Sequence, residues 1–334
     1  MPGFEVIGNE ELQEVQTVFE DSGVLFRRGF GDRRNGTYKV REFEDAFAER
    51  MGADDALAVT SGTAALRVAL AGLDVGPGDE VITQSFTFVA TVEAIIEARA
   101  RPVVAEVDKT LNMDPDDLEQ KITEDTGAII VVHMLGVPAR LDEIMDIADR
   151  HDIPVIEDTA WGCGGSFQHK PLGTHGAIGT FSFDFAKTMT TGEGGMLVFG
   201  DEDAAAKARA WHDHGHENNP KVPRWEDTRS GSGFNFRMME LQGAFGLAQL
   251  EKLDSVVKAH RTNRETLKAV VNEFPVELRT VPEGSFETAD ALVCFVENNR
   301  LARECRQALI DEGLSTKILP EAITWHFAGT WDHM

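Results

Sequence analysis

Residues 181–195 read FSFDFAKTMTTGEGG and place a single lysine, Lys187, between an aromatic, strand-like run and a stretch of small polar residues and glycines. A lysine amine that is shielded from water loses its proton more easily and becomes a nucleophile for carbonyl groups. Ser182 lies in the same run, so we expect its hydroxyl to face the same cavity as the amine. A lone lysine is usually a solvated charge, so this interpretation depends on the neighbouring motifs.

Short β-branched runs alternate with helix-like stretches along the chain. The runs expected to form strands are 81–83, 102–107, 128–132, 153–157, 178–183 and 196–199. Such alternation predicts crossover units and an α/β fold, with a mostly parallel central sheet flanked by helices. A long helix is expected from about Met238, because nothing interrupts the pattern before Pro275. A strand-like ALVCFVE and a helix-like RLARECRQALIDEG follow it.

The composition restricts the partners. The chain has 334 residues and a net charge of −25, from 57 acidic and 32 basic residues. Because so acidic a chain repels nucleic-acid phosphates and anionic lipid, we expect neither nucleic acid nor a membrane as a partner. No run is apolar enough for a membrane span or a signal peptide. The three scattered cysteines match neither a disulfide framework nor a zinc site, and we expect a cytoplasmic protein without a metal.

Small residues precede a helix-like run in VTSGTAALRVAL, residues 59–70. Backbone N–H groups between Ser61 and Thr63 would be free to face an anion, and the positive end of the helix would attract it. An ordinary helix N-cap is the alternative interpretation.

Aromatic and acidic residues are expected at two further strand ends, where the ligands of parallel sheets collect. QSFTFVATVEAI offers Phe86 and Phe88, of which one ring would cover a flat heterocycle unless both pack in the core. In PVIEDTAWGCGGSF, Glu157 and Asp158 end an apolar strand, and a carboxylate buried there requires a cationic partner or hydrogen bonds. Helix capping by the aspartate is the alternative.

A phosphate cradle, a ring-covering aromatic residue, a carboxylate and an imine-forming lysine together describe a site for pyridoxal 5′-phosphate. The matching words SGTAAL, GDEVITQSFTFVAT, IEDTA, FSFDFAKTMTTGEGG and GFNFRMMELQGAFGLAQLEKLD cover most of residues 40–254. Through them the chain resembles the pyridoxal-phosphate-dependent sugar aminotransferases of the DegT/StrS type. That resemblance implies the type I fold of the aspartate aminotransferases.

The resemblance also implies roles for individual residues. Lys187 would form the Schiff base, Asp158 would pair with the pyridine nitrogen, and Phe88 would stack on the ring. Asn235 would reach the cofactor phosphate of the neighbouring subunit, which makes the expected unit a homodimer with shared active sites. The residues expected to hold the phosphate are Gly62, Thr63, Ala64 and Ser182. Trp161 stands where family members commonly carry Gln or His near the ring hydroxyl, and its indole N–H could donate a hydrogen bond there.

The same resemblance divides the chain into three parts: an N-terminal arm and substrate loop (1–40), a large cofactor-binding domain (41–254) and a small C-terminal α+β domain (255–334). Because family members usually continue beyond the WHF-like region, the small domain is expected to be incomplete. A related branch that deoxygenates sugars has His in place of the lysine, so Lys187 argues against that branch.

The substrate interpretation rests on less specific words. The opening MPGFE, the region LFRRGFGDRRNGTYKVREFE, DHGH and the late WHF and WDH words resemble 8-amino-3,8-dideoxy-manno-octulosonate transaminases. These aminate the oxidised C8 of a Kdo-type sugar acid for lipopolysaccharide, with glutamate as the expected donor. Arg27 and Arg28, in a cluster with Arg33 and Arg34, would bind the sugar carboxylate. The diphosphate of a sugar nucleotide would suit the cluster equally, and a solvated loop is the third interpretation.

His214 and His216 are further substrate candidates. WHDHGHENN invites a metal interpretation, but glycine within the run and the lack of a matching ligand cluster argue against it. Two other functions stay open: a nucleotide-linked keto-sugar aminotransferase, and a regulator that binds pyridoxal phosphate without turnover.

Overall fold

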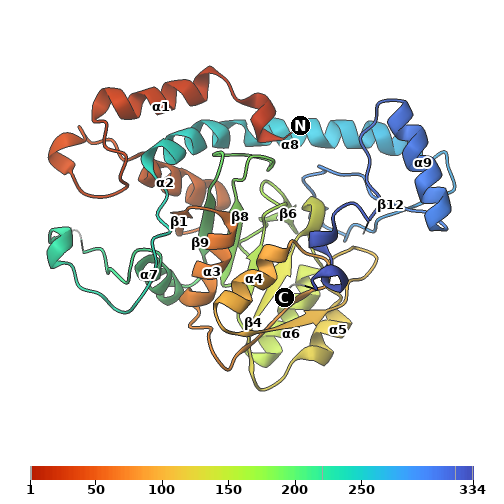
Figure 1. The fold of residues 1–334 in the computed structure, drawn as a ribbon, viewed down its shortest axis with the longest axis horizontal. Coiled ribbons are helices and arrows are strands. Elements are labelled where there is room, and N and C mark those ends of the chain that lie inside the picture. The colour runs from red at the N-terminus through yellow and green to blue at the C-terminus, as the bar shows by residue number, and fades with distance from the viewer. Residues whose placement is uncertain (1, 220, 320, 333) are drawn as a thin grey trace.

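The computed structural model describes residues 2–219, 221–319, 321–332 and 334. Its centre is a seven-stranded sheet in the order β1-β9-β8-β5-β4-β2-β3 (Figure 1). The strands from β8 to β3 run parallel, whereas β9 is antiparallel to both β8 and β1. Their bounds are β1 Asp55–Val59, β2 Glu80–Gln84, β3 Arg101–Ala105, β4 Thr126–Val132, β5 Val155–Asp158, β8 Ile178–Ser182 and β9 Gly195–Phe199. The prediction of a mostly parallel sheet is confirmed.

Helices cover both faces of this sheet. Their bounds are α1 Asn9–Asp21, α2 Lys39–Met51, α3 Gly62–Gly72, α4 Val89–Glu97, α5 Pro115–Lys121, α6 Leu141–His151, α7 Glu202–Trp211, α8 Glu240–Val271 and α9 Asn299–Asp311. Successive strand residues point to opposite faces. In β4, Ile130 packs with α3, α4 and α7, whereas Ile129 and Val131 pack with α5 and α6. Helices α2 and α8 cover the remainder of the second face.

Strand β1 was not predicted from the sequence. Its residues DALAV have little β-branched character, so propensity gives a weak signal. Burial of four of its five residues and antiparallel pairing with β9 along its whole length hold it in the sheet. Tertiary packing therefore decides its conformation.

Helix α8 confirms the long helix expected after Met238. It runs without interruption over 32 residues along the top of the molecule, and α1 lies beside its first half (Figure 1). The expected domain boundary after residue 254 falls inside this helix, and the division into domains stays a prediction. Within the described residues, no helix combines the length and apolar character required to cross a membrane.

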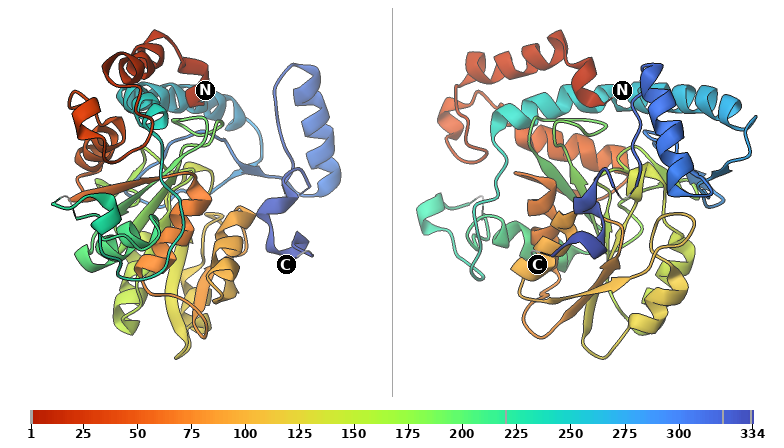
Figure 2. Two further views of the ribbon diagram at one scale, coloured as in Figure 1. Left: turned by 60° about the vertical axis from the view of Figure 1, so that its left-hand side comes forward. Right: turned by 45° about the vertical axis from the view of Figure 1, so that its right-hand side comes forward.

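The C-terminal region projects from the end of α8 (Figures 1 and 2). The strand expected over ALVCFVE is reduced to β12 (Cys294–Phe295), because its antiparallel partner β10 (Glu277–Leu278) is equally short. A separate three-stranded sheet joins β11 (Ser285–Phe286), β6 (Ser166–Phe167) and β7 (Lys170–Pro171). Two 3₁₀ turns, Thr324–His326 and Ala328–Thr330, then return the chain to the end of β2.

Candidate active site

Lys187 lies in the turn after β8 and is half-buried. The Nζ atom is 4.2 Å from the centre of the Trp161 ring. Burial lowers the pKa of Lys187 below its usual value, although the carboxylates of Asp158, Asp184 and Asp290 act in the opposite direction. At a given pH, a larger fraction of this amine is therefore unprotonated than in a solvated lysine. The unprotonated amine is the form that attacks a carbonyl.

Two adjacent carboxylates at the end of β5 have different environments. Glu157 is fully buried and accepts hydrogen bonds from the N–H groups of Gly173 and Gly176 at 2.8 Å, and its Oε2 lies 3.1 Å from His133 Nε2. Burial alone would raise the pKa of Glu157, but His133 and these contacts lower it overall. Because strand neighbours point to opposite faces, Asp158 points away from this set. Residue type alone did not distinguish the two carboxylates in the sequence; the family resemblance assigned Asp158 to the pyridine nitrogen.

Asp158 has fewer stabilising contacts. Its carboxylate accepts hydrogen bonds from Thr91 Oγ1 at 2.9 Å and from the Ala160 N–H at 3.2 Å. Burial raises the pKa of Asp158 despite these bonds and the charge of Lys187. The carboxylate therefore lacks full compensation, and a cation bound beside it would stabilise its ionised form. The protonated nitrogen of a pyridine ring is such a cation.

The beginning of α3 approaches Ser182 closely. A Cβ atom placed on Gly62 would lie only 2.7 Å from Ser182 Cβ, so a larger residue would displace the serine. Ser61 Oγ accepts a hydrogen bond from the Ala64 N–H at 3.1 Å, which shows that the N-cap also exists. Thr63 is exposed beside it, and the helix end and the Ser182 hydroxyl form one polar corner.

The two aromatic candidates, Phe86 and Phe88, differ in their exposure to solvent. Phe86 is buried and stacks on Phe327 with ring centres 4.5 Å apart, so it belongs to the core. Phe88 is 43% exposed at the N-cap of α4, one turn before Thr91. Its ring is therefore free to cover a ligand held between α4 and the lysine.

His326 is a site residue that the sequence reasoning missed. Its ring centre lies 5.1 Å from Phe88 and 6.3 Å from Trp161. Burial and the charge of Lys187 lower the pKa of His326 to about 4, so the imidazole is neutral at neutral pH. Its Nδ1 is buried without a hydrogen-bond partner among the described residues. The only signal was the WHF word, since 3₁₀ turns near the C-terminus carry no periodicity.

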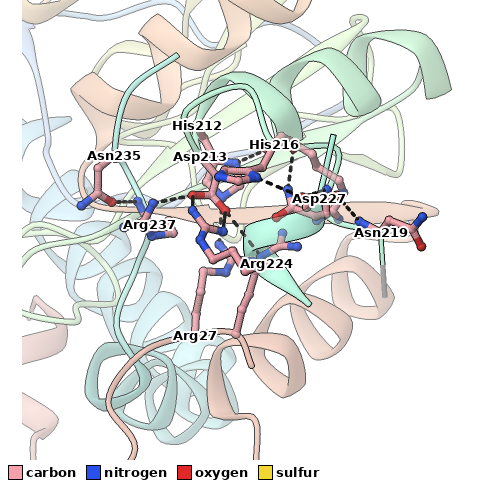
Figure 3. A network of polar contacts seen from close by, with 12 residues as sticks. Arg27, His212, Asp213, His216, Asn219, Arg224, Asp227, Asn235 and Arg237 are labelled. Carbon is pink, nitrogen blue, oxygen red and sulfur yellow. Dashed lines mark hydrogen bonds and ion pairs between the residues drawn. The ribbon is translucent and has the colours of Figure 1, made fainter. Parts of the chain in front are cut away.

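The arginine and histidine candidates belong to a different cluster (Figure 3). Arg27 is buried and donates to Glu44 at 2.6 Å and to the Ala58 carbonyl at 2.9 Å. Asp213 binds both terminal nitrogens of Arg224, at 2.7 and 2.6 Å, and also pairs with Arg237. These arginines lower the pKa of Asp213 to about 2, although burial alone would raise it. We name Arg27, Glu44, Asp213, Arg224 and Arg237 the Asp213 cluster.

The remaining substrate candidates lie in or beside the Asp213 cluster, as does Asn235, which is expected to reach the cofactor phosphate of the neighbouring subunit. His216 is buried with its Nδ1 3.1 Å from Asp227, His214 is exposed, and Asn235 is exposed with its side chain accepting from the Arg237 N–H. Arg28 approaches Asp213 only to 3.9 Å, and its Nε lacks a hydrogen bond among the described residues. Burial and the charge of Arg27 lower the pKa of Arg28 to about 10.

The solvated-loop interpretation of the arginines is wrong for two of the four. Arg27 and Arg34 are both buried, and Arg34 pairs with Glu240 at 3.3 Å, whereas Arg33 is exposed. The described contacts bring together Lys187, Asp158 and Trp161, and separately Gly62 and Ser182. They do not connect this site with Arg27, Arg28, His214, His216 or Asn235.

The residues around Lys187 fit pyridoxal 5′-phosphate. Asp158 offers an undercompensated carboxylate to the pyridine nitrogen, Phe88 offers an exposed ring, and the corner at Gly62 and Ser182 suits a phosphate. Trp161 occupies the position beside the lysine amine.

Comparison with known proteins supports this reading. The family model described as the DegT/DnrJ/EryC1/StrS aminotransferase family matches residues 7–327. The GDP-perosamine synthase of Caulobacter vibrioides is 42% identical over 221 residues, covering 66% of this chain and 58% of that protein. The GDP-perosamine synthase of Escherichia coli O157:H7 is 35% identical over 283 residues, covering 84% and 76%. The chain thus spans somewhat over half of the length of the first relative.

A solved structure extends the likeness to the fold. That of S. venezuelae DesV superposes with a TM-score of 0.81 at 28% identity, covering 92% of this chain and 78% of DesV. The type I fold expected from the sequence is therefore confirmed. The family indicates pyridoxal 5′-phosphate as the cofactor, in agreement with the site residues.

Proposed function

The chain belongs to the DegT/DnrJ/EryC1/StrS aminotransferase family, and on this basis we propose that it is a pyridoxal-phosphate-dependent transaminase that moves an amino group from glutamate to a keto sugar linked to a nucleotide. The observation that carries the proposal is the half-buried Lys187 amine, 4.2 Å from the centre of the Trp161 ring, beside the undercompensated carboxylate of Asp158. The polar corner lies at the beginning of α3, the exposed ring of Phe88 lies at the beginning of α4, and the amine follows the end of β8. A cofactor of this kind requires such a set of groups.

The substrate class follows the relatives rather than the octulosonate resemblance. Two relatives are named for the synthesis of GDP-perosamine, which supports the nucleotide-sugar alternative. Arg27 is engaged by Glu44, so of the two arginines first assigned to a sugar carboxylate only Arg28 keeps an unsatisfied nitrogen. We propose Arg28 as a contact to a substrate anion, with phosphate as the better-supported group.

The roles of the chain's own residues follow from their positions. The cofactor, when bound, acts as the electron sink for the carbanion that forms when the donor loses its Cα proton. Asp158 would hold the ring nitrogen, Phe88 would cover one ring face, and Gly62 with Ser182 would bind the phosphate. Lys187 would remove the proton from the donor and return one at the carbon that receives the amine, as a base and then an acid.

The activity is tested by incubating the protein and cofactor with glutamate and a GDP-linked 4-keto-6-deoxy sugar. The expected product is the corresponding amino sugar, detected by mass spectrometry together with 2-oxoglutarate. Parallel reactions receive an octulosonate oxidised at C8. Amination of the octulosonate alone would overturn the substrate class and restore the sugar-acid interpretation.

A regulator without turnover predicts a different result. In a single turnover with glutamate and no sugar, an aminotransferase converts bound pyridoxal phosphate to pyridoxamine phosphate, and a regulator does not. A homodimer in which Asn235 serves the neighbouring site is part of the proposal. Asn235 is exposed at the surface, so its side chain is accessible to a second subunit. Light scattering of the purified protein would test the dimer.

A further inference from the structure

The turn that carries Lys187 has no regular secondary structure. Residues 183–194, which the structure describes throughout, form neither helix nor strand between β8 and β9. The Lys187 N–H donates to the Asp184 carbonyl within the turn at 3.0 Å. The Lys187 carbonyl, in contrast, is bonded by another part of the chain. The position of the lysine backbone therefore depends on a contact from outside its own turn.

The N-terminal segment Gly3–Val6 supplies this contact. It forms a 3₁₀ turn beside α8 (Figure 1), and the Gly3 N–H donates to the Lys187 carbonyl at 2.9 Å. Two residues before the lysine, the ring of Phe185 stacks on that of Phe4, with ring centres 4.5 Å apart and planes inclined by 8°. The segment therefore contacts both the backbone of the lysine and an aromatic side chain that precedes it.

Gly3 has no room for a side chain. It is buried, and a Cβ atom placed on it would lie 2.6 Å from Gln249 Oε1 and 2.8 Å from Met189 Cα. Both distances are too short for ordinary van der Waals contact, so a larger residue would push the segment away from the lysine turn. The close approach of the two backbones therefore depends on glycine at this position.

A single side chain of α8 bonds both the segment and the turn. Gln249 is buried, and its Oε1 accepts a hydrogen bond from the Thr190 N–H at 3.1 Å. Its Nε2 donates to the Gly3 carbonyl at 3.3 Å and to Glu11 Oε1 at 2.9 Å. Glu11 belongs to α1 and is also buried. Groups outside the turn therefore hold it at the lysine and on both sides of the lysine.

We propose that Gly3 and Phe4, which we name the N-terminal clamp, are positioning residues for Lys187. The lysine side chain starts from the backbone that the clamp holds, and its Nζ atom lies 4.2 Å from the centre of the Trp161 ring. Release of the clamp would let this backbone move and would displace the amine, and a displacement of about 1 Å is enough to slow a reaction. The inference rests on the proposed function, since it takes Lys187 as the reacting amine.

Amide hydrogen exchange tests the clamp without cofactor or substrate. The full-length chain, freed of cofactor, is incubated in deuterated buffer, and uptake by peptides covering residues 183–194 is followed by mass spectrometry. Phe4→Ala removes the ring that stacks on Phe185, so we expect exchange in this turn to become about 5-fold faster. Phe4→Tyr keeps a flat ring and should restore the wild-type rate. Phe19→Ala, which removes an exposed ring of α1, is the matched control and should leave the rate unaltered.

The second measurement follows the amine itself. Each protein is mixed with pyridoxal 5′-phosphate and quenched with borohydride after increasing delays, and the label at Lys187 is measured by mass spectrometry. We expect labelling of Phe4→Ala to be about 5-fold slower than that of wild type, and Phe4→Tyr to recover the wild-type rate. Gly3→Ala should be labelled slowly as well, because its Cβ displaces the segment. A residue that only supports the fold would lower the urea midpoint and leave the labelling rate unchanged.

The two measurements separate this inference from the proposed function. Wild-type rates of exchange or of labelling in Phe4→Ala would overturn the clamp, even if the protein is an active transaminase. A wild-type protein that takes no label at Lys187 would overturn the proposed function, and the exchange rates would still decide whether the clamp holds the turn. Phe4→Leu replaces the alanine variant if circular dichroism shows that the latter does not fold.

Discussion

The Asp213 cluster and the site around Lys187 both bury ionisable side chains, but they compensate the charge differently. Asp213 is surrounded by arginines that lower its pKa to about 2, and Arg27 is matched by Glu44. At the other site the pKa of Lys187 is lowered and that of Asp158 raised, so burial dominates over pairing. Matched charges fix a geometry, whereas unmatched charges leave groups ready to exchange protons or bind a ligand.

This contrast explains why the substrate candidates expected from the sequence differ in how fully their side chains are bonded to other residues. Charged residue types identify both clusters equally well in a sequence. Only the structure shows that Arg27 and His216 have close carboxylate partners, while Arg28 Nε and His326 Nδ1 make no hydrogen bond among the described residues.

The largest effect is expected for Lys187→Ala. Loss of the amine removes both the covalent attachment and the proton carrier, so the glutamate half-reaction should fall by at least about 10³-fold. Stopped-flow absorbance of the bound cofactor measures it. Lys170→Ala, an exposed lysine in β7, is the matched control and should keep its rate. A near-normal rate in Lys187→Ala would contradict the role of Lys187 as the reactive amine.

Removing the carboxylate from the Asp213 cluster should act on stability instead. Asp213→Ala leaves Arg224, Arg237 and Arg28 without their shared anion, which should cost about 3–5 kcal/mol in the free energy of unfolding by urea. Asp203→Ala, exposed at the start of α7, should change it by less than about 0.5 kcal/mol. If both variants lose equally little, the cluster is not a matched network.

The pH dependence of this loss has a definite sign. The folded-state pKa of Asp213 is lowered, so its contribution is fully present above its unfolded pKa of about 3.9 and is lost as the pH falls toward 2. The difference between wild type and Asp213→Asn in urea should therefore shrink below pH 4. A constant difference would contradict the pairing.

Asp158→Asn should behave in the opposite way. Because burial raises the folded-state pKa of Asp158, its carboxyl loses stability as the pH rises through that shifted value, and the neutral asparagine avoids this loss. We expect the cofactor-free variant to be at least as stable as wild type at pH 7. Its transamination rate should nevertheless fall by about 10²-fold, since the ring nitrogen loses its partner. A clear loss of stability at pH 7 would show that Asp158 is a compensated structural charge.

The smallest effect is expected for Arg224→Ala. Its side chain is 34% exposed, and Arg237 and Arg28 remain beside Asp213, so the loss should be about 1 kcal/mol in the same urea measurement. A loss as large as that of Asp213→Ala would mean that one arginine, rather than the network, carries the pairing.

The sequence predicted much of the fold and the central residues of the site, but not the residues that surround Lys187. The strands predicted from β-branched runs are confirmed as β2, β3, β4, β5, β8 and β9, whereas the short strands β6 and β7 were not predicted. Lys187 and Asp158 stand in motif words that local pattern reveals. Strand β1 required its partner β9, and the place of His326 required the return of the C-terminal chain to the end of β2. Long-range contacts of this kind leave no local periodicity.

The central claim concerns one amine, and trapping tests it most directly. The protein is mixed with pyridoxal 5′-phosphate, reduced with borohydride and digested, and the labelled peptide is identified by mass spectrometry. We predict about one cofactor per chain, attached to Lys187. Absence of label, or label spread over the exposed lysines with none at position 187, would contradict the account.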